Sequence, residues 1–75
     1  MNRPPRIVSD LRSVMALDYT EEQRSKIAGS LSAIAREFES QGLHYQEHIP
    51  TAERYLRNAR LFEQLAEAAR GGADV

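Results

Sequence analysis

The sequence predicts an all-α fold, in which an antiparallel helical hairpin carries a short N-terminal amphipathic helix. Three observations lead to this prediction. Apolar residues recur every three or four positions in three separate stretches, as they do on one face of a helix. Glycine and proline separate the second stretch from the third. The 75-residue chain is one small domain, and a domain of this size buries only about 60% of its unfolded surface.

The first helix is expected over about residues 5–17, after a flexible arm of residues 1–4. Proline suits the first helical turn, because it gives up only an amide that has no partner there. The apolar face of this helix lies within about 120° of arc and consists of Ile7, Val8, Leu11, Val14 and Met15. A helix this short is marginal alone in water, so it must dock either on the rest of the chain or on a partner.

The second helix is expected over about residues 20–41. It starts with one of two reciprocal caps, either Asp18 with Glu21 or Thr20 with Gln23. Gly42 is expected to end it as a left-handed residue just past the last turn. Its apolar residues, with spacings of four, three and four, form a seam typical of coiled coils: Ile27, Leu31, Ile34 and Phe38.

The third helix is expected over about residues 50–70, from Pro50 to a stop at the glycine pair 71–72, with residues 72–75 flexible. Helices two and three would each be roughly 30 Å long. They should pair through alanines at heptad spacing, because small residues let two helices approach closely: Ala28, Ala35, Ala52, Ala59 and Ala66. The connection from Leu43 to Ile49 should fold over the end of this hairpin.

Gly29 lies inside the second helix, where glycine is less favourable than alanine by about 1 kcal/mol. One interpretation is that another helix approaches closely at this position. The other is that Gly29 is a tolerated defect on a solvated face.

Composition bounds the function. Ten basic and eleven acidic residues give a net charge of −1, which argues against broad electrostatic capture of nucleic acid or anionic membrane. The absence of cysteine suits a reducing cytosol, and no stretch has the apolar length of a secretory signal or a membrane span. We therefore expect a cytoplasmic protein. Arginine outnumbers lysine nine to one and alanine is abundant, a bias that indicates a bacterial source.

The stretch from His44 to His48 matches the H-x-x-E-H pattern of inverted zinc metalloproteases. Two histidines four apart on a helix could hold zinc, but this stretch lies between Gly42 and Pro50, where a stable helix is not expected. The alternatives are solvated loop histidines or a cap for the third helix. Phosphate-binding loops and a strained nucleophile turn are also missing from the sequence, so we expect no enzyme and no cofactor.

The third helix carries the residues that we expect to bind a partner. Leu56 and Leu61 lie on opposite flanks of its apolar face. Arg54, Arg57 and Arg60, three apart, would form a charged rim, or would simply be a solvated face paired with nearby glutamates. A second interpretation of the same arginines is a nucleic-acid-associated regulator.

We therefore expect a small protein–protein interaction module, such as a regulator, adaptor or inhibitor. Its apolar anchors would come from Leu56 and Leu61 or from Ile7 and Leu11 on the first helix. A homodimer with a four-helix core is the expected assembly. Asn58 would either set the pairing register in that core or lie in water at its edge.

Overall fold

The computed structural model of the chain describes residues 5–70, and nearly all of them are helical. The helices are α1 (Arg6–Asp18), α2 (Glu21–His44) and α3 (Ile49–Ala69). Residues 5–70 contain no strand, and the prediction of an all-α chain with three helices is confirmed. The expected flexible ends, 1–4 and 72–75, and the expected stop at 71–72 lie outside the described residues.

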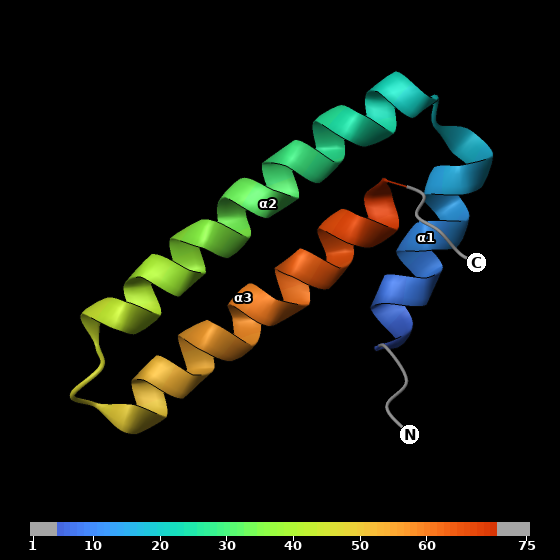
Figure 1. Cartoon of the computed structure of the whole chain (residues 1–75). Coiled ribbons are helices and arrows are strands. Elements are labelled where there is room, and N and C mark those ends of the chain that lie inside the picture. Colours follow the sequence, from blue (N-terminus) through green and yellow to red (C-terminus); the bar gives the residue numbers. More distant parts are fainter. Residues whose placement is uncertain (1–4, 71–75) are drawn as a thin grey trace.

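The helices α2 and α3 form the long antiparallel pair seen in Figure 1. The alanines at heptad spacing are all buried, together with Gly42. Side chains this small allow the two backbones to lie close to one another along the pair.

The prediction that Gly42 ends the second helix is wrong. The helix α2 continues to His44, and Gly42 is buried inside it. A Cβ atom at this position would lie 3.0 Å from Cγ of Leu56 and 3.4 Å from the carbonyl oxygen of Ala52, both on α3. Gly42 therefore allows a close approach between two helices, and residues 45–48 alone connect them.

This shorter connection also changes the surroundings of Leu43 and Ile49. Both residues belong to helices, Leu43 to α2 and Ile49 to α3, and both are exposed. The expectation that Leu43 and Ile49 fold over the end of the hairpin is therefore wrong, because their helical backbones direct them outward. Tyr45, which was expected to fold over the same end, does stack on Tyr55 of α3 at 5.7 Å between ring centroids.

The start of α2 is held by the second of the two caps considered. The amide of Gln23 donates to Oγ1 of Thr20 at 3.1 Å, and the amide of Thr20 donates to Oε1 of Gln23 at 2.9 Å. One η-nitrogen of Arg24 also donates to the carbonyl of Tyr19 at 3.2 Å. These bonds fix the two-residue link between α1 and α2, so α1 turns back onto the hairpin.

The helix α1 packs within the chain, mainly on α3. Val8 contacts Leu65 and Ala68, while Met15 contacts Ala28 and Ala69. Val8 and Met15 are the largest fully buried side chains of the described residues. They hold the N-terminal helix against one end of the hairpin (Figure 1).

The molecule is flat, with Cα extents of 43 × 29 × 16 Å. Its core consists mostly of small side chains, because seven of the ten buried apolar residues in the described part are alanine. No helix within residues 5–70 is both long enough and apolar enough to cross a bilayer.

Candidate interaction surfaces

Large apolar side chains are more common on the surface of residues 5–70 than in their core. Only three buried residues are larger than alanine, namely Val8, Met15 and Leu65. Nine large apolar residues are exposed instead: Ile7, Val14, Leu17, Tyr19, Ile34, Leu43, Tyr45, Ile49 and Leu56. The surface therefore contains the candidate sites.

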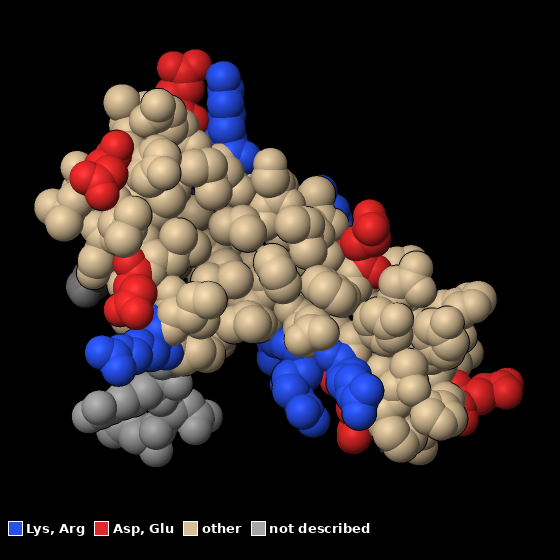
Figure 2. Space-filling model, turned by 180° about the vertical axis from the view of Figure 1, so that it is seen from behind, with Lys and Arg blue, Asp and Glu red and all other residues tan. Residues whose placement is uncertain are grey.

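One surface lies on the side of the hairpin where α1 packs, which we name the α1 face (Figure 2). Four aromatic rings form a continuous strip along it. Phe38 lies 5.4 Å from Phe62 and 6.2 Å from Tyr55, and Tyr55 stacks on Tyr45 at 5.7 Å between ring centroids. These separations are typical of attractive aromatic pairs. Phe62 also packs against the cluster of Val8, so this aromatic strip runs from α1 to the interhelical connection.

The helix α1 covers only one end of this face. It has 13 residues against 24 in α2, a difference of about 16 Å at 1.5 Å per residue. Its core contacts on α2 involve Ile27, Ala28 and Leu31. The later residues Ile34 and Tyr45 are exposed, so α1 leaves the second half of the hairpin uncovered.

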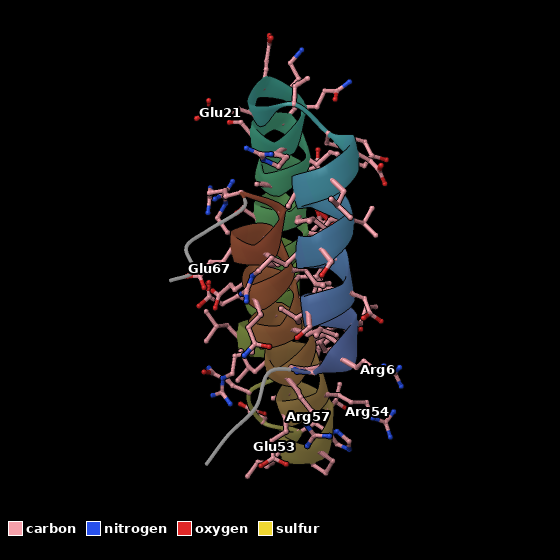
Figure 3. The ribbon with its side chains drawn as sticks, turned by 90° about the vertical axis from the view of Figure 1, so that its right-hand side faces the viewer. Arg6, Glu21, Glu53, Arg54, Arg57 and Glu67 are labelled. Carbon is pink, nitrogen blue, oxygen red and sulfur yellow. The ribbon has the colours of Figure 1, made fainter. Side chains whose placement is uncertain are left out.

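The aromatic strip has charged groups of opposite sign on its two sides. On α2, Glu37 lines a hollow of about 90 Å³ with Ile34 and Phe38. On α3, Arg54 lines a hollow of about 270 Å³ with Thr51, Tyr55 and Asn58. Figure 2 shows basic side chains along one edge of a broad tract without charge, and Figure 3 shows Arg54 directed to the same side as Arg6 of α1.

The second surface surrounds Leu56 and contains three of the residues expected to bind a partner. Leu56, Arg57 and Arg60 line a hollow of about 220 Å³ together with Glu53. The arginine group is therefore divided, because Arg54 lies in the hollow beside Tyr55. With 100° per residue, Leu56 lies on the flank of α3 away from the α1 face.

Two more exposed residues extend this second surface at the tip of the hairpin. Ile49 precedes Leu56 by seven residues and so shares its side of α3. Leu43 follows Gly42, which lies against Leu56. We name Leu43, Ile49 and Leu56 the tip surface.

The other expected partner residues have different surroundings. Leu11 and Leu61 are partly buried against the cluster that joins α1 to α3, so both contact residues of their own chain. Ile7 is exposed. Asn58 is exposed and lines the hollow beside Arg54 and Tyr55; its role in pairing stays a prediction.

The two histidines each have a local neighbour. The ring of His44 meets that of Tyr45 edge-on at 5.1 Å. Nδ1 of His48 lies 2.5 Å from the hydroxyl of Thr51, and His48 occupies the N-cap position of α3 without a side-chain bond to the backbone. Within residues 5–70, no group of three or more potential ligands could hold a metal ion.

The aromatic strip is the feature that sequence reasoning missed. Phe38 and Tyr45 are seven apart, as are Tyr55 and Phe62, and this spacing was a usable signal. Tyr45 lies just past the end of α2 in the connection, where helical spacing alone does not predict the position of a side chain. No family model, curated protein or solved structure matches the chain, so a function must be argued from these surfaces.

Proposed function

We propose that this chain is a small cytoplasmic protein–protein interaction module, acting as a regulator, adaptor or inhibitor, that pairs with a second copy and docks a protein partner. The observation that supports it is the distribution of side-chain sizes, with alanine in the core and large apolar residues on the surface. Exposed apolar patches with polar rims mark sites of interaction. The absence of cysteine agrees with a reducing compartment.

The tip surface is the proposed docking site for the foreign protein. Leu56 is the central anchor, because it lies in a hollow with Arg57 and Arg60 on its rim. An apolar centre with arginine at its edge is the usual composition of a protein interface. The partner should present an apolar side chain with a carboxylate beside it.

The test compares full-length variants in an affinity capture from the native host, followed by titration with the purified candidate partner. The double variant Ile49→Glu and Leu56→Glu should lose the partner. The matched control, Ser30→Glu with Ala33→Glu, adds the same charge at exposed positions of α2 and should retain it. Equal binding by both variants, or no specific partner for the unaltered chain, would contradict this docking site.

Leu61 does not belong in this test. Because it packs against the cluster of Val8, Leu65 and Ala68, a charge at this position should disrupt the docking of α1. A loss of binding by Leu61→Glu would therefore report on folding and not on the interface.

A nucleic-acid-associated role is the second candidate. It is supported by the arrangement in Figure 3, where Arg6, Arg54 and Arg57 come from two helices and lie near one end of the view. Binding to phosphates should weaken steeply as salt rises. A mobility-shift assay at low salt with duplex and single-stranded probes tests it, and the absence of any shift would remove this candidate.

A further inference from the structure

The helix α1 carries a second apolar row that no other part of residues 5–70 covers. Ile7, Asp10, Val14 and Leu17 follow one another at spacings of three, four and three, as in a coiled-coil seam. Ile7, Val14 and Leu17 are 56%, 45% and 83% exposed. This outer row lies away from Val8 and Met15, which hold α1 on α3.

The α1 face of the hairpin also contains an apolar stretch that the rest of the described chain leaves exposed. Ile34 and Tyr45 are each 41% exposed, and Phe38 and Tyr55 are partly exposed between them. This stretch begins where the part of the face that α1 covers ends. The same face therefore has a raised half, formed by α1, and an uncovered half.

We propose that two copies of this chain pair through their α1 faces about a twofold axis perpendicular to α2. Such an axis reverses the direction of the hairpin. Because α1 lies mainly beside α3 and not over α2 (Figure 1), the α1 helix of each copy lies along α3 on the uncovered half of the other, and the two α2 helices face one another directly. The contact is isologous and closes on itself, as in most homodimers. This inference rests on the self-association in the proposed function and names the surface that performs it.

The lengths of the two halves agree with this arrangement. The outer row of α1 belongs to a helix of 13 residues, about 20 Å long. The uncovered part of α2 is about 16 Å long, and the interhelical connection follows it. One α1 helix is therefore long enough to extend along the remainder of the facing α3.

The charges also favour a second copy as the occupant. Asp10 lies within the outer row, among its apolar residues. Arg54 and Asn58 lie beside the aromatic strip. Both can donate hydrogen bonds to a carboxylate of the facing chain. One chain carries both the outer row of α1, which contains Asp10, and the uncovered apolar stretch beside Arg54. Two identical chains can therefore bind one another through both surfaces at once.

Ile34 marks the position of the axis. It lies near the middle of α2, which runs from residue 21 to residue 44, and it is an exposed apolar residue. A twofold axis through the middle of α2 brings this helix antiparallel to its copy. Ile34 then meets Ile34 of the second chain, and the two α2 helices contribute to a four-helix core.

The first part of the test measures the mass of the full chain in solution by light scattering. The unaltered chain should have the mass of two copies. Leu17→Glu should weaken pairing by about tenfold or more without a loss of helix content, because Leu17 is highly exposed. The control, Ala16→Glu, places the same charge on an exposed position of the same helix and should remain paired.

The second part uses the absence of cysteine from the chain. Ile34→Cys should form a disulfide-linked dimer rapidly under mild oxidation, because a disulfide needs Cα atoms within roughly 7 Å. Arg36→Cys, exposed on the same helix but 200° away around it, should crosslink at least about tenfold more slowly.

The outcomes separate this inference from the proposed function. A dimer that is unaffected by Leu17→Glu, or equal crosslinking at positions 34 and 36, would overturn the twofold arrangement and leave self-association intact. A single-chain mass for the unaltered protein at high concentration would overturn both the arrangement and self-association. Docking of a foreign protein at the tip surface would remain separately testable.

Discussion

At the residue scale, two glycines of the same helix have different surroundings. A Cβ atom on Gly29 would meet no heavy atom within 4 Å, whereas one on Gly42 would lie 3.0 Å from Leu56. Within the described chain, then, no helix approaches closely at Gly29. Gly42 has a packing role, because it lets the α2 backbone approach the side chain of Leu56 and the backbone of Ala52.

The contrast gives a prediction for two substitutions. Gly29→Ala should raise the free energy of unfolding by about 1 kcal/mol, because alanine is the better helix former and nothing obstructs its methyl group. Gly42→Ala should fall short of that gain or lower stability, because Leu56 must move to make room. Urea unfolding followed by circular dichroism measures both. An equal rise for the two variants would contradict the packing role of Gly42.

At the element scale, α1 depends on its docking. It has 13 residues, and isolated helices of this length are marginal in water. Met15 and Val8 supply the large side chains of its contact with the hairpin. The Thr20 and Gln23 cap sets the angle between α1 and α2. The buried side chains of Val8 and Met15 then fix the position of α1 on the hairpin.

Met15→Ala tests this dependence. Removing a buried methionine side chain should lower the free energy of unfolding by about 2–5 kcal/mol, which is a large part of the stability of so small a domain. The volume-conserving control, Met15→Leu, should cost less than about 1.5 kcal/mol. Urea unfolding and hydrogen exchange of the α1 amides provide the measurement, and unchanged α1 protection in Met15→Ala would show that α1 is held elsewhere.

At the scale of the whole molecule, the flat shape and the alanine-rich core both leave large apolar side chains at the surface. A domain this thin leaves one side of every helix accessible, and alanine contributes little apolar area when it is buried. The larger apolar residues of α1 and α2 are then available for a second chain. Pairing would bury them and would add stability that a single copy lacks.

If pairing contributes to stability, unfolding must depend on concentration. The midpoint of thermal unfolding should rise as the concentration of the full chain increases, because dissociation accompanies unfolding. Leu17→Glu should show a much weaker dependence. Differential scanning calorimetry over a wide concentration range measures this, and a constant midpoint for the unaltered chain would indicate that folding and pairing are independent.

Sequence reasoning succeeded where the determining interactions are local. The three helices begin and end within a few residues of their expected bounds, because periodicity, Pro50 and the Thr20 cap act over one or two turns. Of the two caps that the sequence allows at the start of α2, the one formed by Thr20 and Gln23 is present. Leu56, Arg57 and Arg60 share a hollow, and their role in binding a partner stays a prediction.

The sequence by itself determined the helices and the rows of alanine at heptad spacing, which place small apolar side chains in the core. Only the tertiary structure decided that Gly42 lies inside α2, that Leu11 and Leu61 pack against one cluster formed by α1 and α3, and that four aromatic rings join into one strip. These features depend on the register between helices that are distant in the chain. Since a glycine has the same local properties at a helix end and at a close contact, the neighbouring Leu56 had to be located before the role of Gly42 could be known.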